Sequence, residues 1–198
     1  MKKITIELNT KSINEARKYL LNLKKQIPKM QKEFLEGVAL WVINKANFHL
    51  NNSDIGENVK IDIRNGWEYE FTTNGIKIIN RTEKAVFVEF GVGIVGQSQA
   101  HPNASAEGYE YNQDSPYKDR KGTGTWVFKS TLQNLDLPQN NVEFAYNTSG
   151  TDYAIVTRGA KGVWYAYNAI VDAQMELAKA NGGEIGKMWE DIKARYIK

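Results

Sequence analysis

Residues 65–78 read NGWEYEFTTNGIKI, and this stretch decides the fold. Aromatic side chains occupy every second position from Trp67 to Phe71, and isoleucine alternates with lysine after Asn74-Gly75. A period of two residues is typical of a strand with one buried face, and Asn-Gly is a strong signal for a two-residue hairpin turn. The stretch therefore predicts an antiparallel β-hairpin.

Other runs of alternating apolar residues lie on both sides of this hairpin. The turns between residues 59 and 90 are short, and parallel pairing would need long crossovers, so the strands there are expected to form an antiparallel meander. The further strands that we expect cover residues 4–8, 59–63, 85–90, 126–128 and 153–156.

Helical periodicity is concentrated at the two ends of the chain. Ser12 and Glu15 fit a capping box, and an apolar stripe with helical spacing follows them. Pro28 interrupts this stripe, which predicts two helices, 12–26 and 28–50, or one kinked helix.

Near the other end, two further helices are expected over residues 163–180 and 185–196, separated by a helix stop at residues 181–183. The fold class is therefore α+β, with the N-terminal helix pair and a C-terminal helix packed on the β-meander. We expect a single domain, 1–198, with a long loop insertion at 91–125 and a C-terminal helical tail at 184–198.

The composition of the 198-residue chain excludes several kinds of chemistry. There is no cysteine, so disulfides, thiolate metal sites and cysteine nucleophiles are impossible. No window approaches the length of apolar sequence that a membrane helix needs, and no apolar segment of a secretory signal follows the first residues. We expect no contact with a membrane.

The net charge of +3 is unevenly distributed, because the first helical region is rich in lysine. This region is either a face that contacts nucleic-acid phosphates or a solvated helix face with a mild basic bias. The solvated face is favoured, since lysine dominates over arginine and no aromatic residues interleave with the charges. The basic residues are Lys11, Arg17, Lys18, Lys24, Lys25, Lys29 and Lys32.

Residues that could carry chemistry show no convincing arrangement. Residues 91–96 match the dinucleotide-binding pattern GxGxxG, but no helix with an apolar stripe is expected after the third glycine, where the mechanism needs one. The two histidines, His49 and His101, lack neighbours with the spacing of metal ligands. We therefore expect no catalytic residue, no cofactor and no metal.

Aromatic residues gather in and just after the glycine-rich stretch 91–125, at Tyr109, Tyr111, Tyr117 and Trp126. Such rings are typical of recognition surfaces, and equally of a loop that is held down on its own domain. Both interpretations stay open. Glu89, on an otherwise apolar strand, is expected either to face a partner subunit or a basic residue, or to follow from alternation alone.

The order of these features resembles the head–tail connector or tail-completion (neck) proteins of long-tailed bacteriophages, in the long form of phages and prophages of Gram-positive hosts. The most specific motif is an aromatic-Val-Glu-Phe-Gly-x-Gly segment at residues 87–93. Around it lie a long N-terminal helix pair, an Asp-x-Gly turn at residues 54–56, and His-Pro at 101–102. Gly-Tyr-x-Tyr-Asn at 108–112 and a Trp-Val-aromatic strand at 126–128 follow.

The resemblance implies a non-enzymatic, structural subunit that forms a ring, commonly of six copies, and that can be a monomer in isolation. It implies contacts with the portal or adaptor assembly and with the tail tube or tail terminator, and a passing contact with DNA in the lumen. It places the chain in the virion, and in the host cytoplasm during assembly. The alternative is a nucleic-acid-binding protein that uses the basic N-terminal helices. The expected interface residues are Glu89, Phe90, Gly91, Gly93, Gly96, His101, Pro102, Tyr109, Tyr111 and Trp126.

Overall fold

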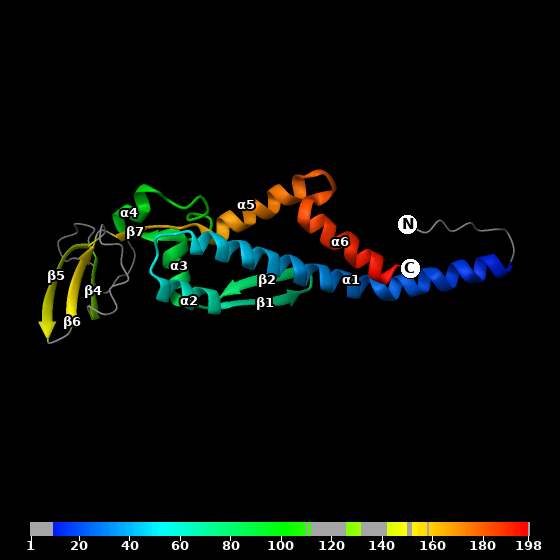
Figure 1. The fold of residues 1–198 in the computed structure, drawn as a ribbon, viewed down its shortest axis with the longest axis horizontal. Coiled ribbons are helices and arrows are strands. Elements are labelled where there is room, and N and C mark those ends of the chain that lie inside the picture. Colours follow the sequence, from blue (N-terminus) through cyan, green and yellow to red (C-terminus); the bar gives the residue numbers. More distant parts are fainter. Residues whose placement is uncertain are drawn as a thin grey trace. The chain divides into compact units, whose positions relative to one another are not determined.

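The structure is a computed structural model that describes residues 10–109, 111, 126–131, 142–149, 152–157 and 159–197, with only the backbone for residues 92–95 and 126–160. Helices dominate and the strands pair antiparallel, so the α+β class is confirmed (Figure 1). The chain divides into two compact units. The first comprises Met1–Val42, Tyr69–Lys77 and Ile170–Lys198, and the second Ile43–Glu68 and Ile78–Ala169. The expected single domain stays a prediction.

One helix, α1 (Thr10–Asn51), occupies the region where two helices were expected, so the two-helix prediction is wrong. Pro28 lies inside it. A proline lacks the N–H that would bond to the carbonyl four residues earlier, and one missing bond can bend a helix without ending it. The alternative of a single helix through Pro28 is the one that the structure supports.

The first unit contains the C-terminal helix α6 (Gly183–Tyr196), which runs antiparallel to α1. Glu184 accepts a hydrogen bond from Trp41, while Arg195, near the other end of α6, pairs with Glu33. Between these contacts Phe34 meets Trp189 edge to face, with ring centroids 5.3 Å apart. The helical tail expected over 184–198 is thus a helix packed on α1.

The predicted hairpin is confirmed as β1 (Trp67–Thr72) and β2 (Gly75–Asn80), which form a two-stranded sheet. Its tip belongs to the first unit, where Tyr69 donates a hydrogen bond of 2.5 Å to Glu36 of α1. Lys32, one turn away, places its ammonium 5.1 Å from the centre of the Phe71 ring. These contacts hold the hairpin tip against α1.

The strand expected over 59–63 is wrong, because helix α2 (Glu57–Asn65) lies there. Its buried residues, Lys60 and Ile63, are three positions apart, which is a helical spacing. Lys60 donates to the backbone oxygens of Asn51 and Ser53, at 3.0 and 2.7 Å. Those carbonyls lie at the C-terminal end of α1, where a helix leaves backbone acceptors without partners. The hydrogen bonds from Lys60 satisfy them, and this contact stabilises α2.

The strand expected over 85–90 is also wrong, because it is helix α3 (Glu83–Phe90). A short apolar run does not distinguish a strand from a buried helix. Here Ala85, Val88 and Glu89 are buried, a spacing of three and four residues that a helix brings to one face. The predicted meander is thereby reduced to the hairpin alone.

After α3 the chain enters a two-residue strand, β3 (Gly91–Val92), and the short helix α4 (Gly93–Ser98). The prediction that residues 91–125 form a loop is wrong for this part. α4 begins before the third glycine and ends two residues after it, so no helix starts at Gly96, as expected. β3 pairs antiparallel with β7 (Gly159–Lys161), a strand that the sequence did not predict. The rest of the expected loop lies largely outside the described residues, as does the strand expected at 4–8.

A third sheet has three antiparallel strands in the order β4-β6-β5. They are β4 (Trp126–Thr131), β5 (Val142–Ser149) and β6 (Asp152–Thr157). Phe128 is opposite Ile155 in the β4–β6 ladder. The strands predicted at 126–128 and 153–156 are confirmed. β5 falls in a polar stretch where no strand was expected.

Helix α5 (Tyr165–Ala178) confirms the helix expected at 163–180. The predicted stop is a single 3-10 turn, Ala180–Gly182, in which Asn181 has a φ of 63° and Gly182 a φ of 72°. Asparagine and glycine adopt this left-handed conformation at low cost. The turn lets α6 begin at Gly183.

Gly162 allows the segment after β7 to lie directly on the end of α3. A Cβ atom at Gly162 would lie 2.5 Å from the carbonyl oxygen of Glu89 and 2.7 Å from the backbone of Phe90. The backbone N–H of Val163 donates to the carbonyl of Val88 at 2.7 Å. This close approach joins residues about seventy positions apart in the chain.

Gly162→Ala is therefore expected to destabilise the second unit by about 1–3 kcal/mol, because backbone atoms must move apart to admit one methyl group. Urea denaturation followed by far-UV circular dichroism measures the change. Gly75→Ala is the matched control, since a Cβ at Gly75 meets no atom within 4 Å. Equal free energies of unfolding for the two variants would contradict this account.

Candidate functional site

The buried carboxylate of Glu89, at the end of α3, binds groups from two other segments of the second unit. Its two oxygens accept hydrogen bonds from the backbone N–H groups of Ala166 and Tyr167, both at 2.9 Å. These are first-turn amides of α5, which have no partners within the helix. The carboxylate also lies favourably at the positive end of the helix dipole. Glu89 thus caps a helix that begins some seventy-five residues later.

His101 is the third partner of Glu89, and it is 5 % exposed. Its Nε2 atom lies 3.1 Å from a Glu89 carboxylate oxygen, while its Nδ1 atom accepts a hydrogen bond of 3.0 Å from the N–H of Asn103. A nitrogen that accepts carries no proton, so the proton of the neutral ring belongs on Nε2, facing the carboxylate. The pair fixes the segment around His101 against both α3 and α5.

Aromatic rings enclose this pair. Phe90 stacks on Tyr109 at 4.6 Å between centroids and lies 4.4 Å from the His101 ring. The Tyr109 hydroxyl donates to the carbonyl of Gly91 at 2.5 Å, and the N–H of His101 donates to the Tyr111 hydroxyl at 2.6 Å. The rings and the Tyr109 hydroxyl together bind the segment 101–109 to β3 and to the end of α3. We name Glu89, Phe90, His101, Tyr109 and Tyr111 the Glu89 cluster.

Trp164 closes the cluster on the α5 side. Its ring meets His101 edge to face at 5.8 Å, and its φ of 56° lies in the left-handed region, which bulky residues avoid. Its indole Nε1 is buried without a hydrogen-bond partner among the described residues. The N–H of Trp164 donates a hydrogen bond of 3.2 Å to the carbonyl of Glu89. This bond offsets part of the free energy that the left-handed backbone of Trp164 costs.

The structure brings half of the expected interface residues together in the Glu89 cluster. Burial of Glu89, His101 and Tyr111 means that they hold the segment down, which favours the self-contained interpretation of the aromatic residues. Of the remaining five, Gly91 is in β3, Gly93 and Gly96 are in α4, Pro102 is exposed beside His101, and Trp126 is in β4 with its side chain outside the description. Their contact with other subunits stays a prediction.

The chemistry available to this cluster is limited by its own hydrogen bonds. Both ring nitrogens of His101 are engaged, and the carboxylate of Glu89 already binds three donors. The GxGxxG segment lacks the parallel strand-helix-strand setting of a dinucleotide site, because β3 pairs antiparallel. No group of three potential metal ligands is found in the part of the chain that the structure describes.

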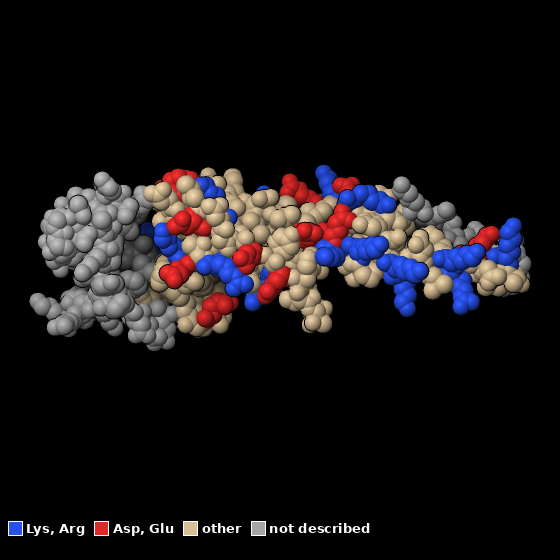
Figure 2. Space-filling view, turned by 90° about the horizontal axis from the view of Figure 1, so that it is seen from below, with Lys and Arg blue, Asp and Glu red and all other residues tan. Residues whose placement is uncertain are grey.

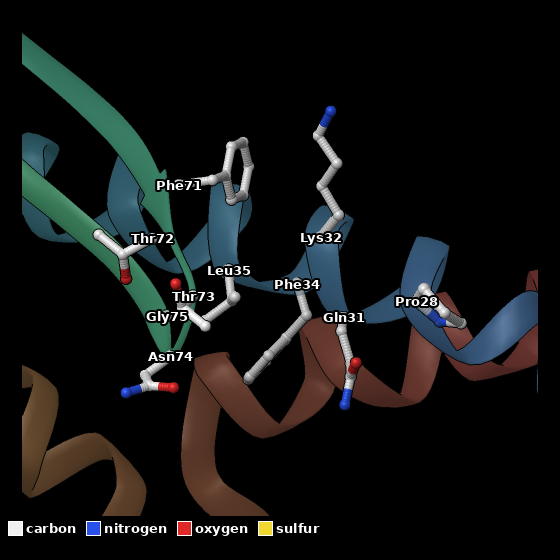
Figure 3. Close-up of a pocket in the computed structure, with 10 residues that line it drawn as sticks. All are labelled: Pro28, Gln31, Lys32, Phe34, Leu35, Phe71, Thr72, Thr73, Asn74 and Gly75. Carbon is white, nitrogen blue, oxygen red and sulfur yellow. The ribbon is translucent and has the colours of Figure 1, made fainter.

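A groove of about 690 Å³ lies between α1 and the hairpin tip in the first unit. In Figure 3, Leu35 points toward the hairpin turn, Lys32 extends away from the groove, and Phe34 and Gln31 point toward α6. Of the α1 residues that line the groove, Phe34 lies on the apolar stripe that the sequence predicted, and no signal showed that the hairpin tip would lie beside them. The lining consists of Pro28, Gln31, Lys32, Phe34, Leu35 and residues 71–75.

Basic side chains gather over the N-terminal half of α1, at the right of Figure 2. Residues 10–29 contain six lysines and arginines and one acid, Glu15. Next to them an apolar hollow of about 430 Å³ is lined by Ile13, Ala16, Leu20 and Leu21, with Arg17 and Lys24 at its edge. This surface combines positive charge with exposed aliphatic side chains.

No protein-family model matches this sequence, and neither the curated proteins nor the solved structures yield a similar protein. Among the helices that the structure describes, none has the length and apolarity required to cross a membrane.

Glu89→Ala is expected to reduce the free energy of unfolding by at least about 2 kcal/mol, because it leaves two α5 amides and one His101 nitrogen buried without an acceptor. Differential scanning calorimetry or urea denaturation measures the loss. Glu83→Ala, on the exposed first turn of the same helix, should cost no more than about 1 kcal/mol. If the Glu89 variant is no less stable than the Glu83 variant, the carboxylate is not the centre of this unit.

Burial, with a smaller effect from Tyr111, raises the pKa of Tyr109 from 10.0 to about 12. The unfolded chain therefore releases this proton at lower pH than the folded chain does. The stabilisation is complete below pH 10 and is lost as the pH rises through about 12. Tyr109→Phe should make the free energy of unfolding fall less steeply in this window, as measured by urea denaturation at a series of pH values. Parallel curves for the two proteins would refute this role for Tyr109.

Proposed function

We propose that this chain is a non-enzymatic structural subunit of the bacteriophage head–tail junction, where it assembles with other copies into a ring, commonly of six. In this proposal it joins the portal or adaptor assembly to the tail tube or tail terminator, in the virion. No cofactor and no catalytic step belong to it. The order of sequence motifs around residues 87–93 supports the family, and the exposed apolar side chains support assembly.

The observation that carries the proposal is the exposure of large apolar side chains in both compact units. Scattered single residues are ordinary on a protein surface, but groups of them mark places where another molecule packs. The second unit exposes Val86 and Phe87 next to each other on α3. The first unit exposes Met175 and Leu177 near the end of α5, at 62 % and 59 %.

A ring needs two different surfaces on every subunit, because each copy binds its neighbours head to tail. Apolar groups on two separate units meet this requirement. The hairpin adds a further possibility for contact, since a two-stranded sheet presents strand edges that another chain can extend. The Glu89 cluster then serves assembly indirectly, because it holds α3, α4 and α5 in the positions from which such surfaces are presented.

Nucleic-acid binding by the basic half of α1 is the second candidate, and the charge shown in Figure 2 favours it. Binding of this kind would weaken steeply with salt, because each phosphate contact releases counterions. The aliphatic hollow beside the lysines fits phosphate contacts poorly, since it offers apolar surface and no stacking ring. We therefore rank it below assembly.

Deletion of the coding sequence from the phage or prophage is the decisive experiment, with electron microscopy of the lysates. DNA-filled heads separate from finished tails are expected, and complementation with the wild-type chain should restore joined particles. Normal infectious particles from the deletion strain would overturn the proposal.

Complementation with Phe87→Asp tests the surface on α3. Burying an aspartate in place of an interface aromatic residue costs about 2 kcal/mol or more per contact, which is roughly a 30-fold loss of affinity. We expect few joined particles, although the purified variant should melt like the wild type because Phe87 is exposed. Glu83→Gln on the same helix is the control and should restore assembly fully.

A further inference from the structure

The apolar stripe of α1 has the spacing of a coiled-coil helix. Apolar residues or glycine occur at alternating intervals of three and four from Ile13 to Trp41. This repeat of 3.5 residues per turn keeps one seam facing a partner helix over many turns. The seam consists of Ile13, Ala16, Leu20, Leu23, Ile27, Met30, Phe34, Gly37 and Trp41.

The chain itself covers the C-terminal part of this seam with α6. Trp189 packs on Phe34, and Met188 approaches Gly37 so closely that a Cβ there would lie 2.3 Å from its sulfur. Met30 is 2 % exposed. Beside the seam, an acid of α1 meets a base of α6, since Glu33 and Arg195 form an ion pair at 2.5 Å.

In the N-terminal part of the same seam three large side chains are exposed, although Ala16 between them is only 8 % exposed. Ile13, Leu20 and Ile27 are 49 %, 58 % and 43 % exposed. The hollow already described lies along them. α6 ends at Tyr196, whose hydroxyl bonds to Glu33, so its contacts reach the middle of the seam and not Ile13.

We propose that residues 13–27 of α1 are a docking surface for an acidic amphipathic helix of another protein. That helix continues, on the same seam, the two-helix packing that α6 begins. At about 1.5 Å of rise per residue the exposed seam is about 21 Å long, which matches a partner helix of roughly fifteen residues. The inference goes beyond the proposed function and does not require that the protein belong to a phage.

Charge identifies the kind of partner. Residues 10–29 carry six positive side chains against one negative. Arg17 and Lys24 take the position that flanks the seam on one side, where coiled-coil partners match opposite charges. An antiparallel second copy of this helix would bring Arg17 and Lys24 against the same two cations, whereas a helix with glutamates at its flanking positions would pair with them.

A helical partner fits this surface better than an anionic membrane does. Helices that lie in a membrane interface usually have a large apolar face of tryptophan, phenylalanine and leucine. The exposed seam is narrow and aliphatic, and its only aromatic neighbour is Tyr19. Its geometry continues that of the α1–α6 contact.

The test uses the full chain and a fluorescent helical peptide of about three heptads with leucine at the seam and glutamate at the flanks. A second peptide with lysine at the flanks is its control. In fluorescence anisotropy the acidic peptide should bind, with an affinity that falls as salt is added, and the basic peptide should not. Equal binding of the two peptides would overturn the proposal.

Variants locate the binding. Leu20→Asp should weaken binding of the acidic peptide by at least about tenfold, because it places a charge in the seam. Leu40→Asp makes the same change at an exposed site of α1 outside the seam and should leave binding unaltered. The double variant Arg17→Glu and Lys24→Glu should bind the basic peptide more tightly than the acidic one. A loss of folding alone would weaken binding of both peptides and would not reverse this preference.

Other occupants of the seam would appear as distinct results. Binding to phosphatidylglycerol vesicles that Leu20→Asp abolishes, without peptide binding, would identify a membrane surface. Self-association that the same variant abolishes would identify a second copy. Absence of any binding would show that the seam is not a docking surface. Each of these results overturns the proposal but leaves the outcome of the deletion experiment unaffected.

Discussion

The second unit depends on one carboxylate. Glu89 lies at the end of α3 and receives the first turn of α5 and the ring of His101. A buried carboxylate is costly unless its oxygens are bound, and here every partner is a group that would itself be left unpaired without it. The arrangement is therefore cooperative: helix end, histidine and acid are each satisfied only when all three are in place.

The hydrogen bonds of Glu89 explain why the chain tolerates strained and unsatisfied groups nearby. Trp164 has a left-handed backbone, and its indole N–H lacks a partner among the described residues. Gly162 is pressed against the backbone of α3. Both positions lie in the short connection that must deliver the α5 amides to Glu89. The hydrogen bonds at the carboxylate offset the local cost of that connection.

The sequence predicted those elements whose signals are local. Alternation and the Asn-Gly turn identified the hairpin, and periodicity identified α1, α5 and α6. It failed at α2 and α3, where short apolar runs fit either period and tertiary contacts decide, such as Lys60 at the end of α1. Of the site, it found Glu89, His101 and the tyrosines as residues of interest. It could not find their partners, since the α5 amides carry no side-chain signature and lie far away in sequence.

Pro28 stands within α1 between the part of the seam that α6 covers and the part that is exposed. One backbone hydrogen bond is missing there because proline has no N–H, so bending the helix costs the least free energy at this residue. α1 is therefore expected to bend more easily there than elsewhere, between the segment that packs on α6 and the docking surface proposed at residues 13–27. The most easily bent point of the helix thus lies where the packing of α1 on α6 ends and its exposed surface begins.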